Sequence, residues 1–91
     1  MQMKLMHFSG RETAILRAID FANGTAGDEI LVRTRMDAQE ALDILNSFLD
    51  IGYIETNPFQ QTHVERRALY STMFEVNPAF VHELKKALVR R

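Results

Sequence analysis

The sequence predicts a mostly helical single domain with one small β-hairpin, and three observations predict it. Ninety-one residues, 46% of them hydrophobic, suffice for one hydrophobic core but not for two. Four helix-start signals are each followed by apolar residues at helical spacing. Between the third and fourth of these segments, the spacing changes to the two-residue alternation of strands. The expected order over residues 1–91 is therefore helix, helix, helix, strand, strand, helix.

Each predicted helix has a start signal of its own. In three of them, a side chain that accepts a backbone N–H is followed three positions later by an acid, which is the pattern of a capping box. The pairs are Ser9 with Glu12, Thr25 with Asp28, and Asp37 with Glu40, and the fourth start is Asn77-Pro78. Asn23-Gly24 and Gly52 supply left-handed ends to the first and third helices. The predicted helices are residues 9–22, 25–34, 37–51 and 77–90.

The predicted hairpin occupies residues 53–76. Residues 53–56 and 69–76 alternate and are rich in aromatic and β-branched side chains, so we expect them to be its strands. The segment from Asn57 to about Arg67 starts with the turn signal Asn-Pro and is otherwise polar. We expect this segment to be an extended loop that projects from the hairpin.

The apolar faces of these elements predict the core, because a helix or strand buries the side chains that share one face. The residues expected to be buried are Ile15, Ile19, Leu31, Leu42, Leu45, Leu49, Ile54, Phe74 and Leu84.

Composition and motifs argue against several functional classes. Cysteine is absent, which removes disulfides and thiolate metal sites. His7, His63 and His82 lie far apart without ligand spacing, and neither a nucleophile motif nor a glycine-rich phosphate loop occurs. We therefore expect no enzyme activity, no metal and no cofactor. No apolar run approaches the roughly 20 residues of a membrane span, and the first eight residues lack a signal-peptide pattern, so we expect a cytoplasmic prokaryotic protein.

Two phrases resemble a known family. The segment Leu45–Glu55, LNSFLDIGYIE, resembles the end of the third helix and the first wing strand of winged helix-turn-helix proteins. The segment Phe74–Pro78, FEVNP, is similar to their second wing strand running into a terminal helix. The resemblance covers about residues 9–88 and implies a winged helix, mostly α with a small β wing at residues 53–76.

The resemblance implies duplex DNA as a partner, with the third helix in the major groove and the wing on the backbone. The residues expected to contact DNA are Arg33, Arg35, Gln39, Asn46, Ser47, Gln61, His63, Arg66 and Arg67. The charge of the third helix opposes this role. Residues 37–51 carry four acids and no lysine or arginine, a formal charge of −4, and the whole chain has a net charge of −1.

A second hypothesis is therefore kept, in which the acidic third helix binds a basic protein partner and the protein does not bind DNA. A homodimer is also expected, through the N-terminal segment and the last helix. The apolar residues of that segment exceed the needs of one small core, and they are Met3, Leu5, Met6 and Phe8.

Overall fold

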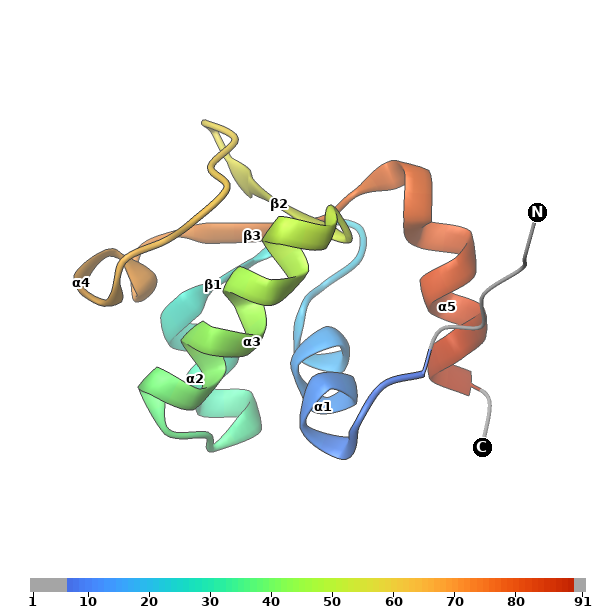
Figure 1. The fold of residues 1–91 in the computed structure, drawn as a ribbon, viewed down its shortest axis with the longest axis horizontal. Coiled ribbons are helices and arrows are strands. Elements are labelled where there is room, and N and C mark those ends of the chain that lie inside the picture. The colour runs from blue at the N-terminus through green and yellow to red at the C-terminus, as the bar shows by residue number, and fades with distance from the viewer. Residues whose placement is uncertain (1–6, 90–91) are drawn as a thin grey trace.

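The computed structural model describes residues 7–89, and over this range the chain is mostly helical with a small antiparallel sheet (Figure 1). The elements in chain order are α1 (Gly10–Ala18), β1 (Thr25–Ala26), α2 (Gly27–Thr34), α3 (Ala38–Ile51), β2 (Ile54–Asn57), α4 (Arg66–Leu69), β3 (Met73–Val76), the 3₁₀ helix η1 (Pro78–Phe80) and α5 (Val81–Val89). Most of the N-terminal segment expected in a homodimer, residues 1–6, lies outside the described residues, as do residues 90–91.

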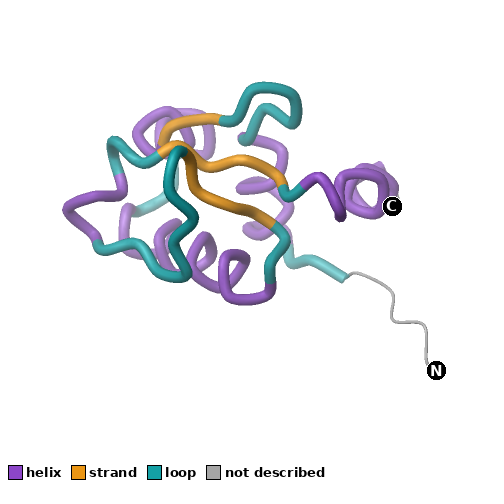
Figure 2. The backbone as a smooth tube through the Cα atoms, turned by 90° about the horizontal axis from the view of Figure 1, so that it is seen from above, coloured by secondary structure: helices purple, strands orange, loops and turns teal. Residues whose placement is uncertain are grey.

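The sheet has three strands in the order β1-β3-β2, all antiparallel (Figure 2). The predicted pairing of the last two strands is present, with Ile54 opposite Val76 and Glu55 opposite Glu75. Strand β1 was not expected. Two residues are too few for an alternating pattern to be recognised in a sequence, because the strand signal needs about four to eight residues.

The core lies between the helices and the sheet, and eight of the nine residues expected to be buried are buried. The exception is Leu31, which is half-buried, whereas its neighbour Ile30 is fully buried. The buried face of α2 is therefore centred one residue earlier in the sequence than predicted. Residues not predicted also fill the core, and they include Leu16, Phe48, Val64 and Leu69.

The start of α1 is confirmed and its end is not. The Ser9 hydroxyl accepts the Glu12 backbone N–H, and the Glu12 carboxylate accepts that of Ser9, as expected of a capping box. The helix ends at Ala18 rather than at residue 22. Beyond it, the Asp20 carboxylate accepts the backbone N–H groups of Ala22 and Asn23. This local turn competes with continued helix for the same donors.

The start of α2 is set by a distant segment and not by Thr25. Thr25 lies in β1, and its hydroxyl accepts the backbone N–H of Asp20. The first N–H groups of α2, from Gly27 and Asp28, donate to the carbonyls of Thr72 and Tyr70. A Cβ atom at residue 27 would lie 1.9 Å from the Leu69 carbonyl oxygen, so this close approach requires glycine.

Helix α3 spans the predicted residues. Asp37 caps its first turn by accepting the N–H groups of Gln39 and Glu40, and Gly52 ends it with a φ of 100°. In a full capping box, the Glu40 carboxylate would also accept the backbone N–H of Asp37. Here Glu40 forms an ion pair with Arg11 instead, as described below.

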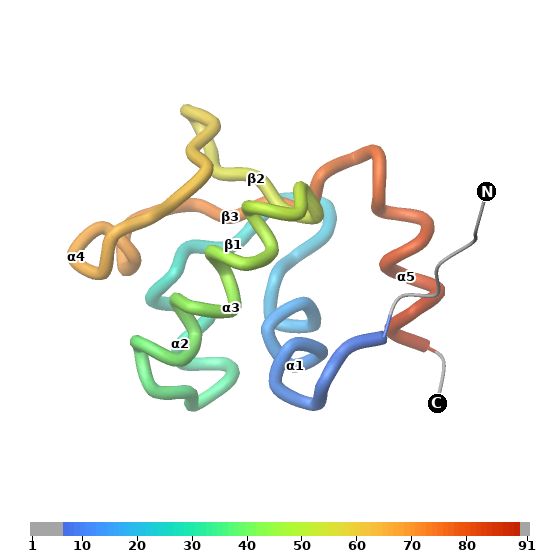
Figure 3. The backbone as a smooth tube through the Cα atoms, in the orientation of Figure 1, coloured from blue at the N-terminus to red at the C-terminus, as the bar shows by residue number. Residues whose placement is uncertain are grey.

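The connection between β2 and β3, residues 58–72, folds back against α3 instead of projecting as one extended loop. Its residues 66–69 form α4, so β3 begins at Met73 and not at residue 69. Val64 and Leu69 anchor the connection in the core. Only its first part, just after β2, stands away from the body (yellow in Figure 3). The prediction failed here because two apolar anchors in a polar stretch do not form a periodic pattern.

The last helix begins where predicted. Asn77 caps η1 by accepting the Ala79 N–H, and Pro78 occupies the first position. An aromatic cluster beside it comprises Phe8, Phe48, Tyr53 and Phe80. Tyr53 contacts the other three rings, Phe8 also contacts Phe48, and the ring centroids of these four pairs are 5.2–6.1 Å apart. Phe8, expected to contribute to a dimer contact, therefore packs within its own chain.

Candidate nucleic-acid interface

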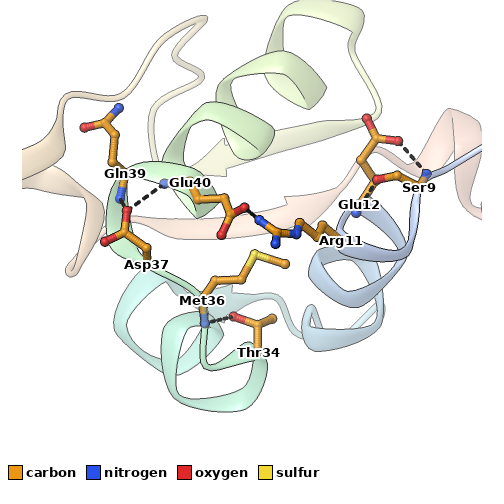
Figure 4. Close-up of polar contacts among 8 residues, drawn as sticks. All are labelled: Ser9, Arg11, Glu12, Thr34, Met36, Asp37, Gln39 and Glu40. Carbon is orange, nitrogen blue, oxygen red and sulfur yellow. Dashed lines mark hydrogen bonds and ion pairs between the residues drawn. The ribbon is translucent and has the colours of Figure 1, made fainter.

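The N-terminal half of α3 lies where three other segments meet (Figure 4). A turn of three residues, Arg35–Asp37, joins α2 to α3. Arg35 ends α2 in the left-handed conformation, with a φ of 59°, and its side chain is exposed. The exposed carboxylate of Asp37 caps α3, so its charge lies against the positive end of the helix dipole.

The first turn of α1 brings an arginine to this place. Arg11 forms an ion pair with Glu40, so the start of α1 and the start of α3 are linked (Figure 4). The Arg11 side chain is 67% exposed, and the Glu40 side chain is 33% exposed. The pair contributes little to stability at such a surface, but it offsets the charge of one of the acids of α3.

Helix α4 brings two more arginines. A guanidinium nitrogen of Arg66 lies 3.5 Å from the side-chain oxygen of Gln39. The amide nitrogen of Gln39 in turn donates to the carboxylate of Asp43, at 2.9 Å. Arg67 follows on α4 and is exposed. Gln39 therefore bridges an acid of α3 and an arginine of α4.

This arrangement changes the charge of the surface. Three arginines are placed at the first half of α3 by these contacts and by the α2–α3 turn, and they match three acids of this half and its cap: Arg11, Arg35, Arg66, Asp37, Glu40 and Asp43. The formal charges of these six side chains cancel, whereas Asp37, Glu40 and Asp43 alone carry −3. Asp50, near the C-terminal end of α3, lies outside this surface.

Two predicted contact residues make hydrogen bonds to distant parts of the chain. Arg33 donates to the carbonyl of Ala18 at 2.8 Å and pairs with Glu29 at 3.2 Å, so it caps the end of α1. The side-chain amide of Asn46 donates to the carbonyl of Val64 and accepts its N–H. Asn46 thus holds the connection after β2 against α3, whereas Arg33, whose side chain is 47% exposed, keeps guanidinium N–H groups that these contacts do not use.

The remaining predicted residues are exposed but do not form one cluster. Ser47 lies further along α3, and Gln61 and His63 lie in the connection after β2. Arg66 and Arg67 were expected on a projecting loop, and they lie instead on α4 against α3. The part that projects carries Phe59, whose exposed fraction is 76%.

Sequence reasoning overlooked Arg11. No pattern around residue 11 indicates that the start of α1 lies beside the start of α3, because the two are far apart in sequence and meet only through core packing.

Comparison with known proteins gives no relative from which a role can be transferred. No protein-family model matches the chain, and no curated protein or solved structure is significantly similar to it. Within residues 7–89, no group of three or more histidines and acids is arranged to hold a metal ion. Over the same residues, no helix combines the length and apolar character that crossing a bilayer requires.

Proposed function

We propose that this protein is a winged helix-turn-helix module that binds duplex DNA with the first half of α3 and with α4. In this proposal, α2 and α3 are the helix-turn-helix, and β2 and β3 are the wing strands. The proposal is supported by the order of the elements and by the short turn between α2 and α3.

The observation that carries the proposal is the group of arginines around the start of α3. DNA presents about one negative charge per 1.7 Å of its axis, so a helix of charge −4 alone would be repelled. Arg11, Arg35, Arg66 and Arg67 reduce that repulsion at the end of α3 that faces α4 and the start of α1.

The residues divide by chemistry into two kinds of contact. Arg35, Arg66 and Arg67 are exposed and suit phosphate oxygens, which position a protein without reading sequence. Gln39 and Ser47 are the exposed polar side chains of α3 that suit base edges. Because the surface is neutral overall, we expect weak binding that is detected best at low salt.

A salt titration tests the proposal. The affinity of the full chain for a random-sequence duplex is measured from about 20 to 200 mM salt. Contacts to three phosphates should give a log–log slope of about −2.7, since each phosphate contributes about −0.9. The absence of binding at the lowest salt concentration would contradict DNA binding.

A second candidate function is binding of a basic protein partner, and the C-terminal end of α3 favours it. Asp50 is exposed there, next to Ile51, whose exposed fraction is 55%. An exposed aliphatic side chain beside an acid suits a partner with cations around an apolar centre. In that case Asp50→Asn weakens the complex with the partner and leaves duplex binding unchanged.

A homodimer through α5 is part of the proposal as well. Val89 near the end of α5 is 75% exposed, and exposed apolar side chains at a helix end suit contact with a second copy. Sedimentation of the full chain at micromolar concentration tests it, and a monomer mass at every concentration would contradict it.

A further inference from the structure

A groove lies between the end of α1 and α5, away from the surface around α3. Its volume is about 560 Å³. Ile19 and Phe21, just after α1, and Leu88 of α5 supply its apolar lining. Ile19 is buried, and Phe21 and Leu88 are half-buried, so these side chains form the floor.

The edges of the groove are cationic. Arg17, Lys85 and Lys86 line it, and no acid of the described residues does. The local formal charge is thus +3 on a chain whose net charge is −1. Glu83 belongs to α5 but lies outside the lining.

Two contacts hold cations at this edge. A guanidinium nitrogen of Arg17 donates to the carbonyl oxygen of Leu88 at 2.6 Å, which ties α1 to the end of α5. The ammonium of Lys85 lies 6.0 Å from the centre of the Phe21 ring. The positive charges are therefore next to the apolar floor and not spread over distant parts of the surface.

We propose that this groove binds organic carboxylates that have an apolar body, such as aryl-alkanoic or medium-chain fatty acids. Small-molecule sites are largely apolar with a few polar groups that fix orientation, and this groove has that composition. A small inorganic anion would leave the apolar floor exposed to water. A neutral hydrocarbon would gain nothing from three cations. A carboxylate with an apolar body uses both features. This site does not depend on DNA binding.

The first experiment compares ligands that differ in one property. The full chain, labelled with ¹⁵N, is titrated with 4-phenylbutyrate, decanoate, the neutral 4-phenylbutanamide and acetate. Both long carboxylates should shift the backbone signals of residues 17–21 and 82–89 to saturation. The amide should bind about tenfold more weakly, and acetate should not bind, because one lacks the charge and the other the apolar body. Equal binding of 4-phenylbutyrate and its amide would overturn the proposal, as would the absence of saturable shifts.

The second experiment uses variants at exposed positions, which the fold tolerates. Lys85→Gln combined with Lys86→Gln should weaken carboxylate binding about tenfold. Glu83→Gln is the control on the same helix: it removes one charge outside the groove lining, whereas the double variant removes two within it, and binding should change by less than about twofold. Circular dichroism verifies that each variant is folded. Unchanged binding in the folded lysine double variant would overturn the proposal.

Discussion

The protein gathers cations at two places, and their surroundings differ. Around the start of α3, arginines alternate with acids, as in the contacts that link Arg66, Gln39 and Asp43. In the groove beside α5, the cations of Arg17, Lys85 and Lys86 lie over apolar side chains without any lining acid. The first surface is polar and neutral, and the second is apolar and positive.

This difference is the reason for proposing two kinds of ligand. A neutral surface with separated arginines suits an extended polyanion, which repeats its charge and can meet each arginine in turn. A compact positive edge beside apolar walls suits a single anion with an apolar body. The number of cations is similar at both places, so the groups between the cations decide the proposed specificity.

Removal of core volume under α3 should have the largest effect, because both surfaces depend on the same core. Leu45 is fully buried. Leu45→Ala should lower the free energy of unfolding by about 2–5 kcal/mol, as cavity-forming substitutions do. Denaturant unfolding measures this loss. A loss below about 1 kcal/mol would mean that the core does not support α3 as described.

Removal of the α4 arginines should separate the two surfaces. Arg66→Ala combined with Arg67→Ala should weaken duplex binding to all sequences alike and reduce the salt slope by up to about two units. Phenylbutyrate binding should not change, since neither residue lines the groove. Lys85→Gln combined with Lys86→Gln should instead weaken phenylbutyrate binding and leave duplex binding unchanged. If each double variant weakened the binding of both the duplex and phenylbutyrate, the two surfaces would not be distinct.

Neutralisation of one acid tests how closely DNA approaches α3. Asp43→Asn keeps an oxygen that can accept the Gln39 amide, so the local structure should persist. Duplex binding should strengthen by about two- to fivefold, because one exposed repulsive charge is removed. A weaker complex with a basic protein partner, together with unchanged duplex binding, would favour the second candidate function.

The smallest expected effect concerns the turn that places Phe21 in the groove. The backbone N–H groups of Ala22 and Asn23 donate to Asp20 and hold the pKa of its carboxyl below the usual value. Since this pKa is lower in the folded state, the stabilisation is present at neutral pH and is lost as the pH falls through the folded-state value. Asp20→Asn should therefore lower the urea midpoint slightly at pH 7. The difference from wild type should disappear in acid, and duplex binding at pH 7 should not change.

Local chemistry explains which predictions were confirmed. The Ser9–Glu12 cap, the Asp37 cap, the Gly52 end and the Asn77-Pro78 start all involve residues within a few positions of one another. The helical face of α3 follows from a long periodic pattern, which is why its bounds and the burial of Leu42, Leu45 and Leu49 were predicted correctly. The two hairpin strands were predicted from their alternation, whereas the register that places Glu55 opposite Glu75 is a finding of the structure.

The candidate site was predicted only in part, because its composition depends on distant contacts. Arg33 and Asn46 have the chemistry of DNA contacts, yet they also hydrogen-bond to Ala18 and Val64, 15 and 18 positions away. Arg11 has no distinguishing pattern and was overlooked.

The sequence by itself determined the four longer helices, the two hairpin strands and most of the core, though not all of their ends, since these depend on propensity, capping and periodicity over a few residues. Only the tertiary structure decided the short strand β1, the fold of the connection against α3 and the charge around the start of that helix. Electrostatic interaction depends on distance in space, so a charge of −3 counted along residues 37–43 is offset once α1, the α2–α3 turn and α4 bring their arginines beside it.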